Sequence, residues 1–224
     1  MITPLTGWYL FVLGLATGMV ILDMTVYRKL SPRWLRWLLL ALAAFTGSRY
    51  LTMALFAHTA SPQRWWFLRH CWMASSIGLT VPSVLVLDQL LRHPSWSAKK
   101  VLQYFSPFIA VYLAVIIFGR FSPSNDPSLG SLQPVLTGAW PAVIAYVQGV
   151  FVLGFAALCV LILTQVRSRR VRGAVLGLLC AHLYLGLDGV LLALGHVYFR
   201  PFLFSEIIAL AAIGHAFDTA LQRA

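Results

Sequence analysis

The chain has 224 residues, of which 60% are hydrophobic and only 10% are charged. Because a soluble domain of this length could not solvate so apolar a surface, the composition excludes a soluble globular protein and indicates an integral membrane protein. The net charge of +11 would favour nucleic-acid binding in a soluble protein. Here the basic residues cluster beside apolar segments, so the expected partner is the lipid bilayer and no nucleic acid is expected.

Seven segments are apolar over about 20 residues, the length that crosses the hydrocarbon core of a bilayer. In chain order they cover residues 8–27, 34–57, 65–91, 101–119, 140–166, 171–197 and 202–217. The longest connection, residues 120–138, is rich in Pro, Ser and Gly and is predicted to be an irregular loop. The start of the chain lacks the basic region and cleavage site of a signal peptide, so the first segment is expected to remain as an anchor. The prediction is an all-α membrane protein, a single seven-transmembrane helix bundle over residues 1–224.

Lysine and arginine are unevenly distributed over the connections between these segments. The first, third and fifth connections are rich in basic residues, whereas the others carry few. The basic residues of those three connections are Arg28, Lys29, Arg33 and Arg36, then Arg92, Lys99 and Lys100, and finally Arg167, Arg169, Arg170 and Arg172. Since basic loops are retained on the cytoplasmic side of a membrane, we expect the N-terminus outside and the C-terminus in the cytoplasm.

Two opposite charges are predicted deep inside the outer half of the membrane. Arg49 and Asp188 lie about 12 and 13 Å below the outer ends of their segments. An uncompensated charge at such a depth costs at least about 2.5 kcal/mol, so we expect an Arg49–Asp188 ion pair. Glu206 lies closer to the outer surface and could join the pair through water, and Arg69 and His70 open the third segment on the same side. Together these residues predict an outward polar pocket that binds a ligand. The alternative is a pair that only fixes the register of the helices.

Three further aspartates, Asp23, Asp88 and Asp218, lie near the predicted cytoplasmic ends of their segments. Each has an arginine close by in the sequence, so each is expected to reach the interface and pair there.

Two small-xxx-small patterns favour close helix packing. They are "GLATG", with Gly14 and Gly18, and "GAVLG", with Gly173 and Gly177. Such patterns let helix backbones approach closely, either within one chain or between copies in a homo-oligomer.

The histidines leave a second interpretation open. His182 and His196 share one face of the sixth segment with small residues between them. Their spacing of fourteen residues resembles that of the axial ligands in two-haem membrane cytochromes b. His70 and His215 lie at matching depths on other segments, so a haem b redox protein is the alternative to a cofactor-free protein.

No catalytic motif accompanies these residues. The sequence has no HxxxH zinc pair, no P-loop, no dinucleotide glycine fingerprint and no GxSxG nucleophile elbow. The last segment also has no lysine to bind retinal. No catalytic residue and no metal ligand is therefore assigned, and an enzyme or small transporter of unrecognised type remains the third interpretation.

The order of these features resembles the seven-transmembrane N-terminal sensor region of bacterial sensor histidine kinases. As in that region, the third segment opens with "RWWFLRHCW" and continues into "VPSVLVLDQLL", and a long outer loop separates the fourth and fifth segments. The sixth segment follows an arginine-rich connection, "RSRRVRG", and the seventh ends in "IGHAFDTALQR".

The resemblance implies a receptor in the bacterial cytoplasmic membrane that binds a small or lipidic ligand from the outer side and takes part in two-component signalling. Members of that family usually continue into a cytoplasmic kinase or cyclase module, which this sequence lacks up to Ala224. We therefore expect a separately encoded cytoplasmic signalling protein as the partner. Such coupling requires two states that differ in affinity for the ligand or the partner.

Overall fold

The chain folds as a bundle of long helices. The structure, a computed structural model, describes residues 4–58, 69–91, 98–124, 133–194 and 202–223. The helices are α1 (Pro4–Tyr27), α2 (Arg33–His58), the short 3-10 helix η1 (Arg69–Cys71), α4 (Ala74–Leu91), α5 (Ala98–Phe118), α6 (Trp140–Gln165), α7 (Arg169–Ala193) and α8 (Leu203–Leu221). Six of them, α1, α2, α4, α6, α7 and α8, are long and apolar enough to cross a membrane, and α5 contains the shorter apolar stretch Phe105–Phe118. The protein is thus a multi-pass membrane helical bundle.

The helix bounds follow the predicted segments closely, with one exception. The third segment was predicted to begin at residue 65, but α4 begins at Ala74, and η1 and a turn at Trp72 and Met73 precede it. The apolar and aromatic run continues through these residues, so hydropathy alone could not separate the turn from the helix.

The connection at residues 120–138 is not wholly irregular, and that prediction is wrong. Strands β1 (Phe121–Ser124) and β2 (Gln133–Leu136) pair in antiparallel fashion, with Phe121 opposite Leu136. Pro123 faces Pro134 in this pair. Because proline donates no hydrogen bond to a sheet, its presence in both segments argued against strands in the sequence.

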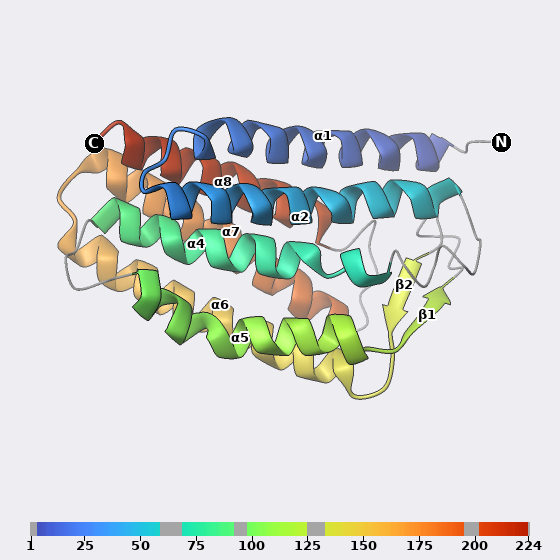
Figure 1. The fold of residues 1–224 in the computed structure, drawn as a ribbon. Helices are drawn as coiled ribbons and strands as arrows, with labels where there is room; N and C mark the ends of the chain where they lie inside the picture. The colour runs from blue at the N-terminus through green and yellow to red at the C-terminus, as the bar shows by residue number, and fades with distance from the viewer. Residues whose placement is uncertain (1–3, 59–68, 92–97, 125–132, 195–201, 224) are drawn as a thin grey trace.

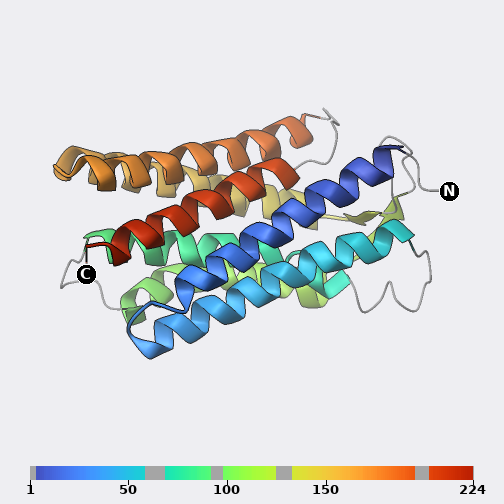
Figure 2. The same cartoon turned by 90° about the horizontal axis from the view of Figure 1, so that it is seen from above.

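The helices run side by side along one axis, and the N-terminus and the small sheet lie at the opposite end from the C-terminus (Figure 1). Seen from above, α8 lies between α1 and α7 (Figure 2). α8 also packs on α4, which in turn packs on α2 and α5. Most residues of α4 and α8 are buried, so these two helices form the centre of the bundle.

The closest helix contacts occur at glycines that the small-xxx-small patterns do not include. A Cβ at Gly78 of α4 would overlap Thr46 of α2, and one at Gly214 of α8 would overlap the Asp23 carboxylate of α1. In contrast, no neighbouring helix within the described ranges comes within 4 Å of a Cβ built at Gly14, Gly18, Gly173 or Gly177. Packing within the bundle therefore does not use the two patterns.

Basic residues gather at the end of the bundle that holds the C-terminus. This end carries the connections from α1 to α2 and from α6 to α7 (Figure 1). Its described basic residues include Arg28, Lys29, Arg33 and Arg36, together with Arg167, Arg169, Arg170 and Arg172. In the rest of this article it is called the basic end, and the end with the sheet is called the opposite end.

Candidate functional site

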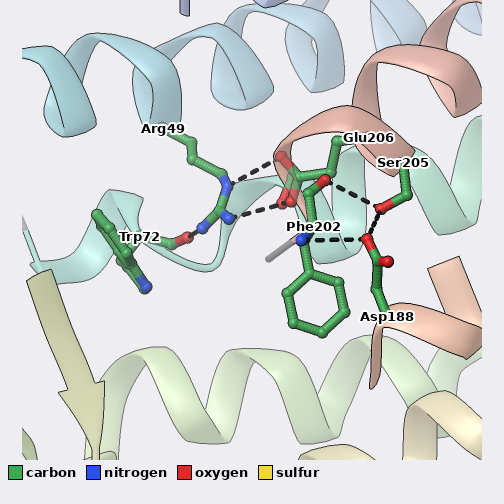
Figure 3. A network of polar contacts seen from close by, with 7 residues as sticks. Arg49, Trp72, Asp188, Phe202, Ser205 and Glu206 are labelled. Atoms are coloured by element: carbon green, nitrogen blue, oxygen red, sulfur yellow. Dashed lines mark hydrogen bonds and ion pairs between the residues drawn. The ribbon is translucent and has the colours of Figure 1, made fainter. Parts of the chain in front are cut away.

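A buried ion pair joins α2 to α8 in the half of the bundle nearer the opposite end (Figure 3). Arg49 Nη2 lies 3.1 Å from Glu206 Oε1, and Arg49 Nε donates a hydrogen bond of 3.3 Å to Oε2. The two side chains are only 8% and 5% exposed. Two parallel contacts of this kind fix the guanidinium and the carboxylate in one geometry.

Trp72 and Ser75 extend the pair to the segment around the start of α4. Arg49 Nη1 donates a hydrogen bond to the carbonyl oxygen of Trp72, and the Arg49 guanidinium lies 5.2 Å from the centre of the indole ring, a cation–π contact. The Ser75 hydroxyl donates to Glu206 Oε1 at 2.7 Å. Four residues from three parts of the chain therefore satisfy both buried charges.

Asp188 on α7 caps the start of α8 instead of pairing with Arg49. Its Oδ2 accepts hydrogen bonds from the Phe202 backbone N–H at 3.2 Å and from the Ser205 hydroxyl at 2.5 Å (Figure 3). The first turn of a helix has unpaired N–H groups and a positive partial charge, so it stabilises a nearby carboxylate. Phe202 has a positive φ of 69° just before the helix, which turns the chain into α8.

The expected Arg49–Asp188 pair is therefore wrong, although both residues are buried as predicted. The partner of Arg49 is Glu206, which the sequence analysis placed closer to the outer surface and able to join the pair through water. Glu206 lies in the first turn of α8, so the dipole of that helix stabilises its charge as well. The carboxylates of Asp188 and Glu206 thus both gather at one helix start.

Tyr50 lies next to this network on α2. Its phenol is buried and within electrostatic range of Glu206, Arg49 and Asp23. Tyr50 is therefore near both the ion pair and Asp23, a buried aspartate closer to the basic end.

The remaining predicted site residues, Arg69 and His70, lie on η1. Arg69 opens η1, but its side chain is outside the described part of the chain. His70 is half-buried in the same short helix. η1 packs against α2, which carries Arg49.

The histidines of the haem interpretation lie in different environments. His182 is 1% exposed, its Nδ1 contacts the carbonyl oxygen of Leu178 at 2.9 Å, and its ring lies 4.2 Å from that of Phe155. Its Nε2 has no hydrogen-bond partner among the described residues. His215 is exposed on α8, and His196 is outside the described residues. The space beside Gly186, one turn after His182, is filled by the Val152 side chain.

Sequence reasoning missed Trp72, Ser75, Phe202 and Ser205. Two of them contribute backbone groups, which no residue type signals. The serines carried a weak signal, since a buried charge in a membrane helix requires hydrogen-bond donors nearby. Within the described ranges, no three His, Cys, Asp or Glu side chains are grouped so that they could hold a metal ion.

Comparison with known proteins gives no further assignment. No protein-family model matches the sequence, and no curated protein and no solved structure matches it significantly.

Proposed function

We propose that this chain is a seven-span sensor module of a bacterial cytoplasmic membrane. In this proposal an anionic small or lipidic ligand enters from the outer side and replaces Glu206 at Arg49. The N-terminus and the opposite end of the bundle would face outward, and α5, with 21 residues, would be the seventh span. The observation that carries the proposal is the buried Arg49–Glu206 pair between α2 and α8.

The chemistry of the pair suits an anion site. A guanidinium presents its donors in a planar fork that matches a carboxylate or a phosphate, and burial strengthens each contact. Arg49 lies about 13 Å from the end of α2 at His58, which is within reach of a ligand from that side. A ligand carboxylate could therefore make the contacts with Arg49 that Glu206 makes in the structure.

Exchange of the anion would also move a helix. Glu206 is held to Arg49 and Ser75, while its neighbour Ser205 is held to Asp188, so these contacts position the start of α8. α8 then runs for 19 residues, about 28 Å, to the basic end. A ligand that binds better when the pair is open would shift α8 and so change the surface that the basic end offers to a separate cytoplasmic protein.

Binding of anionic amphiphiles tests this proposal. The protein in lipid nanodiscs is titrated with oleate, dodecyl phosphate and succinate, with methyl oleate as the uncharged control, and tryptophan fluorescence and melting temperature are recorded. Trp72 should report binding because its ring lies 5.2 Å from Arg49, and Trp72→Phe identifies its share of the signal.

The variants then separate an anion site from a structural lock. Arg49→Gln should abolish binding, whereas Glu206→Gln should strengthen it because the internal competitor for Arg49 is gone. Arg120→Gln is the matched control, since Arg120 is an exposed arginine at the same end of the bundle. Failure of all three anions to bind, or equal binding to Arg49→Gln, would contradict the proposal and leave the pair as a register lock.

A further inference from the structure

A third buried carboxylate lies nearer the basic end than the ion pair does. Asp23 of α1 was expected to reach the membrane interface and pair with Arg28, but it is only 2% exposed and packs between helices, so that expectation is wrong. Its Oδ2 has no hydrogen-bond partner among the described residues. The one ion pair in the described part of the chain is Arg49–Glu206, so no cation there compensates Asp23.

The fold makes room for this carboxylate. Gly214 of α8 faces Asp23 so closely that a Cβ there would overlap the carboxylate, and would lie 3.2 Å from its Cγ. Any larger residue at position 214 would have to displace Asp23 or part the two helices. The contact therefore requires a glycine opposite the Asp23 side chain.

The groups around Asp23 favour a proton as its ligand. From α2 the Tyr50 phenol is within electrostatic range, and on α1 Tyr27 follows one turn later. On α8, His215 is exposed and Asp218 accepts a hydrogen bond from Gln222. None of these neighbours is a buried cation, and the described residues offer no group of three ligands for a metal ion. An ionised carboxylate in such a place is strongly disfavoured and is neutralised instead.

The site also lies near the basic end. Asp23 is four residues from the end of α1, about 6 Å along the helix axis, next to the connection that carries Arg28 and Lys29. Since this end is nearer to Asp23 than the opposite end, a proton exchanged with the solution at the basic end would not pass the Arg49–Glu206 pair.

We propose that Asp23, seated against Gly214 between α1 and α8, is a proton-binding site that exchanges its proton with the solution at the basic end. The proton stays on the carboxyl group while α1 and α8 are in contact. Its release to water leaves an anion, which is drawn toward the cationic groups of the basic end and loosens the contact at Gly214. This site is independent of the ligand proposed for Arg49.

Infrared spectroscopy of the protein in lipid nanodiscs tests the site directly. A protonated carboxyl group has a C=O stretch that an ionised carboxylate lacks and that shifts in D₂O. At neutral pH this band should be present and should lose a component in Asp23→Asn. The component should persist in Asp218→Asn, the matched aspartate on α8.

Hydrogen exchange tests the link to helix packing. After correction for the base-catalysed rise of intrinsic amide exchange, the second half of α1 should lose protection as the pH is raised and the band is lost, and Asp23→Asn should abolish this loss of protection. A band at neutral pH that is unchanged in Asp23→Asn would overturn the proposal. Failure of Asp23→Asn to fold would overturn it as well, because the amide reproduces the shape and charge of a protonated carboxyl group.

Discussion

Replacing Arg49 by methionine should destabilise the protein by about 3–5 kcal/mol, because it leaves Glu206 as a buried charge without a cation. The Glu206 side chain is 5% exposed and would keep only the Ser75 hydroxyl among its described hydrogen-bond donors. Glu206→Leu should cost a similar amount, since it leaves the guanidinium with the carbonyl oxygen and ring of Trp72. The double variant Arg49→Met/Glu206→Leu should lie within about 1 kcal/mol of the native protein, because two apolar side chains can replace a buried pair.

Reversible unfolding in mixed micelles of dodecyl maltoside and sodium dodecyl sulfate, followed by circular dichroism, measures these free energies. Arg120→Met is the control for loss of an exposed arginine. A cost below about 1 kcal/mol for Arg49→Met, the size of a surface salt bridge, would refute the reasoning from burial. Additive costs in the double variant would likewise show that the two side chains act separately.

Three other predictions concern the cap, the glycine contacts and the histidines. Asp188→Ala should lower the free energy of unfolding by about 1–2 kcal/mol in the same assay, because α8 loses its cap. Asp188→Asn should lower it less, because an amide oxygen still accepts hydrogen bonds. Equal losses in the two variants would contradict the capping role. Gly78→Ala should cost about 1–3 kcal/mol because its Cβ would lie 3.0 Å from Thr46 Cβ and 3.3 Å from the Leu42 carbonyl oxygen. Gly14→Ala should instead be neutral or stabilising by about 0.5–1 kcal/mol, since a Cβ there meets no neighbouring helix of the described residues within 4 Å. A larger loss of stability in Gly14→Ala than in Gly78→Ala would contradict the helix packing described above. Protein expressed with ample haem should have no stoichiometric Soret band, because His182 is packed against Phe155 while His215 is exposed. A Soret band that shifts on reduction and is lost in His182→Ala would favour the haem b interpretation.

The two buried carboxylates near the start of α8 and the one near its end give this helix a central place in both proposals. Its first turn contacts α2, α4 and α7 through Glu206 and Ser205, and Gly214 receives Asp23 from α1. Polar contacts therefore hold the start of α8, and the close contact with Asp23 lies in its second half. The ligand proposed for Arg49 and the proton proposed for Asp23 would therefore act on the same element from opposite sides of the membrane.

The helical segments could be predicted from the sequence because each must present about 20 apolar residues to lipid whatever its neighbours are. Burial of Arg49, Asp188 and Glu206 could be predicted for the same reason, since position along a span gives depth. The turn at Trp72 and the strands at residues 121–124 and 133–136 could not be predicted, because their polar, proline and aromatic residues do not follow a simple period.

Which groups meet was decided only by the tertiary structure. Ser205 and Glu206 are adjacent in sequence, but neighbouring side chains on a helix are about 100° apart, so one faces Asp188 on α7 and the other faces Arg49 on α2. Depth along a span says nothing about this rotation, which packing of α8 against α1, α4 and α7 sets. For that reason the sequence by itself predicted Arg49 and Asp188 at one depth and Glu206 nearer the outer surface, and only the assembled bundle paired Arg49 with Glu206 and set Asp188 as the cap of α8.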